Sequence, residues 1–176
     1  MIQKNDFVVY GCNGVCTVGD IGPLEIPGVP KERVYYTLIP YYTKDSQIFV
    51  PADSTKAVLR PVISRDEFLK LMDEIPSMDV LWVDEEKQRD FIYKETLRKS
   101  SCFGLLQIMK TVERRRQERT AKGKKMTATD EKYVHLAEKN LFEEGAIALG
   151  VAPAQVKEQV RARLLHAMET QPVEIS

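Results

Sequence analysis

Lysine and arginine side chains are concentrated in the middle of this chain, where they could bind a polyanion. The stretch from Lys87 to Lys125 holds thirteen basic residues and four acids, a net charge of +9, although the 176 residues together have a formal charge of zero. Residues 63–86 carry −6, residues 126–176 carry −3, and residues 1–62 are balanced. Because gathering like charges costs free energy, a polyanion such as a nucleic acid is the usual partner of such a stretch. The alternative is a solvated helical surface whose charges pair at i,i+4 spacing.

Trp82 is the single tryptophan of the chain and lies just before the basic stretch. A lone tryptophan near a domain junction is often a core or docking residue. An indole can also wedge against a base step or a groove wall, as apolar side chains do in proteins that hold distorted DNA. Its position beside the basic stretch makes Trp82 a candidate for DNA contact.

The basic stretch does not have the composition expected of a reader of base sequence. Its aromatic residues, Phe91, Tyr93 and Phe103, do not form the interleaved platform typical of single-strand binders. No short segment rich in Asn, Gln and Arg suits the edges of bases. We therefore expect contacts with phosphates and groove shape, and little sequence discrimination. The candidate DNA-contacting residues are Trp82, Lys87, Arg89, Lys94, Arg98, Lys99, Arg114, Arg115, Arg119, Lys124 and Lys132.

The sequence shows no arrangement of residues that favours catalysis. Residues 11–14, Gly-Cys-Asn-Gly, lack the helix and lysine that follow a phosphate-binding glycine loop. The only histidines, His135 and His166, are isolated, and the acids at positions 84–86 stand where a helix start favours them. We predict that the protein is not an enzyme and uses no cofactor and no small-molecule substrate.

Composition indicates a soluble cytoplasmic protein. No apolar stretch approaches the ~18 residues that span a bilayer, and residues 1–6 lack the apolar core of a signal peptide. Cys12, Cys16 and Cys102 form neither a paired framework nor a set of two ligand pairs. Reduced thiols are therefore expected, rather than disulfides or a zinc site.

The first 62 residues have the pattern of a small β domain. Asn13-Gly14 lies between two β-prone runs and predicts a hairpin with a type I′ turn, and the prolines and glycines of residues 22–30 predict an exposed loop. Five short strands separated by turns favour a small SH3-like or Tudor-like barrel or a strongly bent, open sheet with a free edge. The predicted strands are residues 7–10, 15–18, 33–39, 47–50 and 57–59.

From residue 63 to residue 176 the pattern is that of an all-α bundle, so the fold class is α+β. Ser64-Arg65-Asp66-Glu67 is a capping box that starts the first helix. A second helix, ending near Lys99, is expected to bury Phe91, Ile92 and Leu97. Later start and stop signals, in the order of the chain, are Thr127 or Thr129 as an N-cap, Gly150 as a C-cap, and Pro153 in a first turn.

Five segments together resemble the CarD/CdnL family, and the N-terminal part is also similar to the RNA polymerase-interacting domain of transcription-repair coupling factors. The resemblance covers nearly the whole chain. The segments are Phe7-Val8-Val9-Tyr10, Asn13-Gly14-Val15, Ile48-Phe49-Val50-Pro51-Ala52-Asp53, Tyr93-Lys94-Glu95-Thr96-Leu97 and Arg114-Arg115-Arg116-Gln117-Glu118-Arg119.

The resemblance implies a bacterial transcription regulator with two domains. Residues 1–62 would be a Tudor-like domain that binds the β subunit of RNA polymerase, and residues 63–176 a helical domain that contacts promoter DNA at the upstream fork and stabilises the open complex. A free sheet edge can accept a partner strand. Docking on polymerase would raise the effective concentration of the basic helices at the DNA. The polymerase-binding residues implied are Leu24, Tyr36, Ile48, Phe49 and Val50.

Two positions depart from the family pattern. The family tryptophan lies about four residues before the Tyr-Lys pair, where this chain has Arg89, and Trp82 lies about two helical turns earlier. The strand before Val-Pro can carry a polymerase-contacting arginine in the family, and this chain has Phe49 there. We expect Trp82 to fold back into the same role and the polymerase contact to be more apolar.

Two other functions fit parts of the sequence. A protein–protein adaptor would use the basic helices to bind an acidic protein surface. An RNA-binding Tudor-like module would need an exposed aromatic cluster among the tyrosines of the β domain, which could instead be core and strand-pairing residues. Whether transcription rises or falls is open, because stabilising an intermediate can do either. The tyrosines concerned are Tyr10, Tyr35, Tyr36, Tyr41 and Tyr42.

Overall fold

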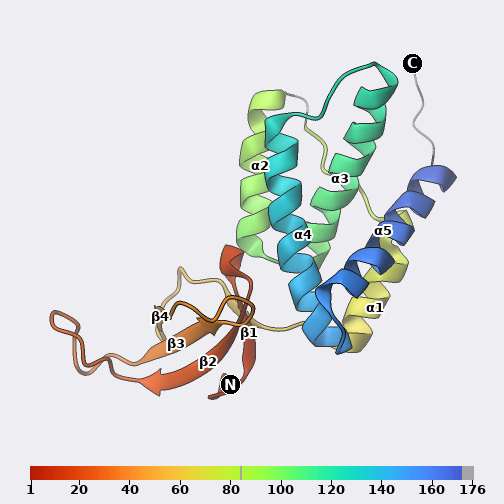
Figure 1. Cartoon of the computed structure of the whole chain (residues 1–176). Coiled ribbons are helices and arrows are strands. Elements are labelled where there is room, and N and C mark those ends of the chain that lie inside the picture. The colour runs from red at the N-terminus through yellow and green to blue at the C-terminus, as the bar shows by residue number, and fades with distance from the viewer. Residues whose placement is uncertain (84, 172–176) are drawn as a thin grey trace. The chain divides into compact units, whose positions relative to one another are not determined.

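The computed structural model describes residues 1–83 and 85–171, which form two compact units (Figure 1). The sheet unit spans Met1–Val62 and the helical unit spans Ile63–Ser176. The α+β fold class predicted from the sequence is confirmed. Within the described residues, no helix is both long enough and apolar enough to cross a membrane.

The sheet unit, all of whose residues are described, is one open antiparallel sheet of five strands in the order β4-β3-β2-β1-β5. β2 is longer than predicted because it continues past a bulge between Val18 and Asp20, and such a bulge bends and twists the sheet. β4 and β5 form the two edges. The strands are β1 (Phe7–Tyr10), β2 (Val15–Gly22), β3 (Tyr35–Pro40), β4 (Ile48–Pro51) and β5 (Leu59–Pro61).

One face of this sheet forms a small core. Its fully buried side chains are Val8, Cys16, Val18, Leu38 and Val50. Side chains of a strand alternate between the two faces of a sheet. Val50 therefore points into the core, and its neighbour in β4, Phe49, points away from it with 40% of its surface exposed.

The β1–β2 hairpin is present, but the predicted type I′ turn at Asn13-Gly14 is wrong. Residues Gly11–Asn13 form a 3-10 turn, and the positive φ angles belong to Gly11 (46°) and Gly14 (75°). The Tyr10 amide donates to the Gly14 carbonyl at 3.0 Å and closes the loop. A glycine at each end of the four-residue connection supplies the left-handed backbone without a penalty, so Asn13 does not need it.

Within the described residues, the helical unit contains five α-helices, and the predicted caps lie at ends of three of them. Ser64 and Glu67 form the capping box of α1, Thr127 accepts a hydrogen bond from the Asp130 amide to start α4, and α4 ends at Gly150 with φ of 68°. Pro153 is the first residue of α5. The helices are α1 (Arg65–Glu74), α2 (Glu86–Lys99), α3 (Cys102–Ala121), α4 (Ala128–Leu149) and α5 (Pro153–Thr170), with a 3-10 turn, η2, at Ile75–Ser77.

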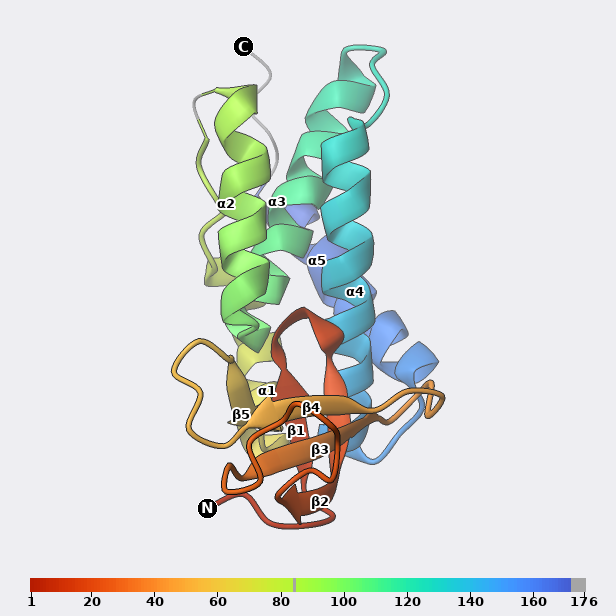
Figure 2. The same cartoon turned by 90° about the vertical axis from the view of Figure 1, so that its left-hand side faces the viewer.

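The expectation that α2 buries Phe91 is wrong, because 65% of Phe91 is exposed. The face of α2 that packs on α3 and α4 (Figure 2) carries Arg89, Tyr93 and Leu97, one turn apart. The Arg89 guanidinium is buried against the Tyr93 ring, 5.9 Å from the ring centroid to the guanidinium carbon, and pairs with Glu86. Hydrophobicity alone predicted that Phe91 would be buried. The structure instead buries Arg89, whose charge is paired with Glu86.

Gly145 of α4 leaves no room for a side chain. A Cβ atom at this position would lie 2.6 Å from Phe68 Cζ and 2.9 Å from Val156 Cγ1, closer than van der Waals contact allows. We predict that Gly145→Ala lowers the free energy of unfolding by about 1–3 kcal/mol, although alanine favours a helix over glycine by about 1 kcal/mol. Thermal or urea unfolding followed by circular dichroism measures the change.

A second substitution tests whether the destabilisation by Gly145→Ala comes from crowding against Phe68. Phe68→Leu removes the nearest ring atoms, so Gly145→Ala should cost less in the Phe68→Leu background than in the native chain. An equal cost in the two backgrounds would contradict the packing explanation.

Candidate nucleic-acid interface

The structure divides the predicted DNA-contacting residues into exposed and internal groups. The exposed lysines are Lys87, Lys94 and Lys99 of α2, Lys124 of the loop after α3, and Lys132 of α4. Arg98 is also exposed and pairs with Glu95 at 3.2 Å, one turn away on the same helix. Such surface pairs contribute little free energy, so Arg98 is available to an anionic ligand.

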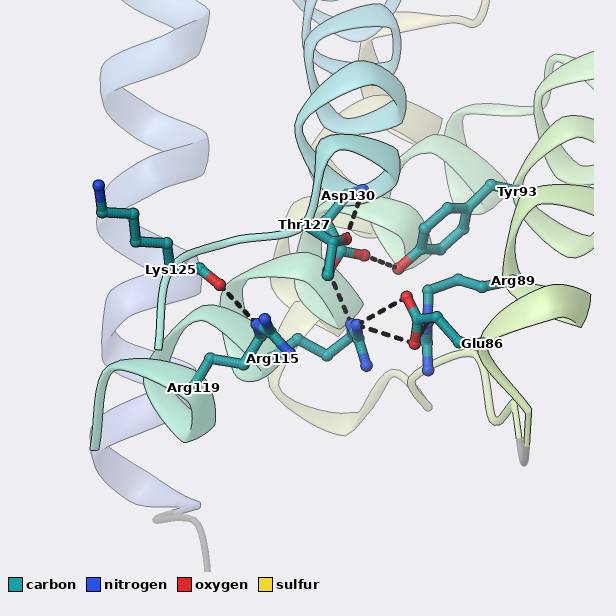
Figure 3. Close-up of polar contacts among 8 residues, drawn as sticks. All are labelled: Glu86, Arg89, Tyr93, Arg115, Arg119, Lys125, Thr127 and Asp130. Carbon is teal, nitrogen blue, oxygen red and sulfur yellow. Dashed lines mark hydrogen bonds and ion pairs between the residues drawn. The ribbon is translucent and has the colours of Figure 1, made fainter. Parts of the chain in front are cut away.

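Arg115 belongs to a partly buried network that joins three helices (Figure 3). Its Nε lies 2.9 Å from Asp130 Oδ2 of α4, and its Nη2 lies 3.2 Å from Glu86 Oε1 of α2. The Tyr93 hydroxyl donates to Asp130 Oδ1 at 2.9 Å. We refer to Glu86, Tyr93, Arg115 and Asp130 as the Asp130 network.

The Asp130 carboxylate is buried, with 1% of its side chain exposed, and the network supplies its partners. Burial, and the negative charge of Asp130 nearby, raise the pKa of the Tyr93 hydroxyl, which therefore stays protonated and donates. Arg89 adds a second pairing to Glu86, with its Nε 3.2 Å from Glu86 Oε2. Arg89 and Arg115 thus have anionic partners in the chain itself, and neither is among the exposed cations.

Two more arginines contact main-chain carbonyls. Arg119 Nε donates to the Lys125 carbonyl at 2.6 Å (Figure 3), which holds the basic loop against the end of α3. Arg114 Nη2 donates to the Gln171 carbonyl at 3.3 Å, next to the end of α5. Both side chains are only partly exposed.

Trp82 lies after η2 in a segment without helix or strand structure, and 84% of its surface is exposed. The core position that a lone tryptophan often takes is therefore not what the structure shows. The indole is open to solvent and to any ligand.

Three side chains of α3 hold the segment that leads to Trp82. Lys110 Nζ donates to the carbonyls of Ile75, Pro76 and Met78 at 2.8, 3.0 and 2.6 Å. Gln107 Nε2 donates to the Asp79 carbonyl at 3.3 Å, and the Leu81 amide donates to Thr111 Oγ1 at 2.9 Å. Gln107 lies one turn before Lys110 and Thr111, so the three side chains project from the same side of α3.

Lys110 is a structural member of the basic stretch. It is 2% exposed, and burial, reinforced by the positive charge of Arg114, lowers its pKa. Three carbonyl oxygens compensate its desolvation. Sequence reasoning did not find this role. The available signal was a lysine within the apolar run of α3, between Met109 and Thr111 and two residues before Val112.

The residues implied in polymerase binding also divide into buried and exposed side chains. Val50 is buried in the core of the sheet unit, and Tyr36 and Ile48 pack against that core. Leu24 is partly exposed in the loop after β2. Of the three β4 side chains among them, Phe49 is the one that points away from the core.

The backbone of β4 faces outward at Phe49. The Ala52 amide donates to the Val34 carbonyl at 2.9 Å, in register with the β3–β4 ladder. Because bonded and non-bonded pairs alternate in an antiparallel ladder, the pairs of Tyr36 with Val50 and of Leu38 with Ile48 are bonded. The amide and carbonyl of Phe49 therefore point away from β3, toward the open edge.

The tyrosines of the sheet unit do not gather into one platform. Tyr41 and Tyr42 pack edge to face, with centroids 5.0 Å apart, and Tyr41 packs in the same way on Phe7 at 5.1 Å. Tyr35 and Tyr36 lie on β3, and Tyr36 packs against the core. Part of the surface of each of the Tyr41 and Tyr42 rings is therefore covered by the other ring.

The three carbonyls that accept hydrogen bonds from Lys110 give a test of whether this lysine of α3 anchors the segment before Trp82. We predict that Lys110→Met lowers the free energy of unfolding by about 2–4 kcal/mol, since a buried carbonyl that loses its donor costs about 1–3 kcal/mol. The fluorescence anisotropy of Trp82, the single tryptophan, should fall because its segment loses an anchor. Urea unfolding and steady-state fluorescence measure the two effects.

Lys99→Met is the matched control, because Lys99 is exposed at the end of α2. This variant should stay within about 0.5 kcal/mol of the native chain. A native-like stability of Lys110→Met would show that the carbonyls find other donors and that Lys110 is not an anchor.

Comparison with known proteins places the sheet unit in a family. Residues 2–63 match the family described as the CarD-like/TRCF RID domain. A search of curated proteins found no match to the chain. The match covers the five strands and ends at the boundary between the two units. The N-terminal unit of this protein is a CarD-like/TRCF RID domain.

Proposed function

We propose that this protein is a transcription regulator that docks on RNA polymerase through its sheet unit and contacts promoter DNA through its helical unit. The observation that carries the proposal is the RID match over residues 2–63, since an RID domain is an RNA polymerase-interacting domain. The polymerase β subunit is the proposed docking partner. The proposal gives the protein a binding function and no reaction to catalyse.

The β4 edge is the proposed docking surface. β4 pairs with β3 on one side, and within the described residues no strand pairs with its other side. The outward amide and carbonyl of Phe49 can extend a ladder onto a strand of the polymerase, and the exposed Phe49 ring adds apolar contact. Backbone hydrogen bonds then give affinity, and alternate side chains give specificity.

The exposed cations of the helical unit are the proposed DNA contacts. They are Lys87, Lys94, Arg98, Lys99, Lys124 and Lys132, with the exposed indole of Trp82 near the start of α2. Arg114 and Arg119 contribute charge from partly exposed positions, while Arg89 and Arg115 are assigned to the interior of the bundle. Contacts from lysines to phosphates position a protein on DNA without reading its sequence.

Docking and DNA contact together explain how a modest basic surface could act at a promoter. A helical unit tethered to polymerase meets promoter DNA at high effective concentration. If it binds the open complex more tightly than the closed one, it shifts the population toward the open complex.

The outward backbone of Phe49 gives a test of docking. We predict that Phe49→Pro weakens binding of the full chain to purified bacterial RNA polymerase β subunit by roughly tenfold or more, an effect of about 1.4 kcal/mol. Proline removes the outward amide while the amides that bond β3 are kept. Calorimetry or a pull-down measures the loss.

Phe49→Ala separates the backbone from the ring, because it keeps the amide and removes the aromatic side chain. Retention of more affinity in Phe49→Ala than in Phe49→Pro supports pairing through the edge. Native affinity of Phe49→Pro would rule out docking at this position of β4.

Salt dependence tests the DNA half of the proposal. We predict that Lys87→Gln and Lys94→Gln each reduce the slope of log K against log salt by about 0.9 for each phosphate that the variant no longer neutralises. The loss of affinity should be similar on unrelated duplex sequences. Fluorescence anisotropy titrations between low and moderate salt give the slopes.

Lys157→Gln on α5 is the control, since Lys157 is exposed on a helix that contributes no proposed contact. An adaptor that binds an acidic protein surface would instead show little affinity for DNA at any salt concentration. That outcome would replace the DNA half of the proposal with the adaptor function.

A further inference from the structure

Phe91 is an exposed aromatic residue in the middle of a regular helix. α2 spans Glu86–Lys99, and Phe91 has 65% of its surface in solvent. It is neither at a frayed end nor in a loop. An apolar ring held at such a position by a rigid helix is poised to contact a partner.

Positive side chains surround Phe91 on its own face of α2. Lys87, Lys94 and Arg98 lie four residues before it, three after it and seven after it, so the four side chains form one stripe along the helix. All four are exposed. We refer to these residues as the α2 stripe.

α2, the helix that carries the stripe, lies beside α4 (Figure 2). The Tyr133 hydroxyl of α4 donates to Asp90, the residue before Phe91, at 2.8 Å, and the Tyr93 hydroxyl donates to Asp130. These two bonds join α2 to α4, which run in the same direction (Figure 1). Lys132 Nζ lies 5.0 Å above the Tyr133 ring, which brings another cation to the border between the two helices.

Cations around an aromatic ring suit a nucleic acid better than an acidic protein surface. The lysines would serve either partner, but only nucleic acid offers the flat face of a base beside each phosphate. In a closed duplex the base faces are covered by their neighbours. In melted DNA they are exposed, and a ring on a positively charged helix can stack on them.

We infer that the α2 stripe is a site for DNA with unpaired bases, in which Phe91 stacks on a base while Lys87, Lys94 and Arg98 contact the flanking phosphates. The inference rests on the proposed function and names the feature that would distinguish open from closed promoter DNA. Phe91 supplies the preference for melted DNA, and the cations supply affinity for any DNA.

The test compares the full chain on two DNAs of the same length, a duplex and the same duplex with a central bubble of non-complementary bases. Fluorescence anisotropy gives the ratio of the two affinities. We expect the native chain to prefer the bubble, Phe91→Ala to lower the ratio about tenfold, and Phe91→Tyr to retain it. Lys87→Gln should weaken binding to both DNAs by the same factor.

A second readout reports stacking directly. With 2-aminopurine in the bubble, the native chain and Phe91→Tyr should change the probe's fluorescence on binding, and Phe91→Ala should not. Phe91 is exposed, so Phe91→Ala should retain the native melting temperature.

The failures of the two proposals are distinguishable. A bubble preference that is unchanged in Phe91→Ala would overturn the role of Phe91 and leave the DNA half of the proposed function intact. Lack of binding to both DNAs by the native chain would overturn both. Equal affinity of the native chain for the two DNAs would overturn the inference alone.

Discussion

The helical unit depends on the buried carboxylate of Asp130. A buried charge without partners is costly, and this one is satisfied by Tyr93 of α2 and Arg115 of α3. Arg115 also reaches Glu86 at the start of α2, so three helices meet at one set of charges. Removing Arg115 would leave the buried Asp130 charge without its cationic partner. The network therefore fixes the rotation of α2 and, with it, which residues α2 presents to solvent.

The same packing gives the basic stretch two physical roles. Arg89, Lys110 and Arg115 are turned inward, where carboxylates or carbonyl oxygens compensate their charge. The exposed lysines of α2 instead present their charge to solvent. A net charge of +9 in the sequence thus overstates the charge offered to a ligand. What a ligand meets is a narrower surface that includes the α2 stripe.

The two units use different chemistry for recognition. The sheet unit offers main-chain hydrogen-bonding groups at the β4 edge, which suit another extended chain. The helical unit offers charged and aromatic side chains on rigid helices, which suit phosphates and base faces. A protein with both kinds of surface can join a protein partner to nucleic acid, which is the combination that our proposed function requires.

The sequence by itself determined the local structure and the fold class. Ser64, Thr127, Gly150 and Pro153 mark helix ends because caps act within a few residues of the chain, and the open five-stranded sheet followed from β-prone runs separated by turn residues. Tertiary packing decided which side chains face outward. Phe91 is exposed and Arg89 is buried because Arg89 finds Glu86 and the Tyr93 ring beside it. Whether such a charged or aromatic side chain is buried depends on the partners that folding brings next to it, and not on the hydrophobicity pattern along the chain.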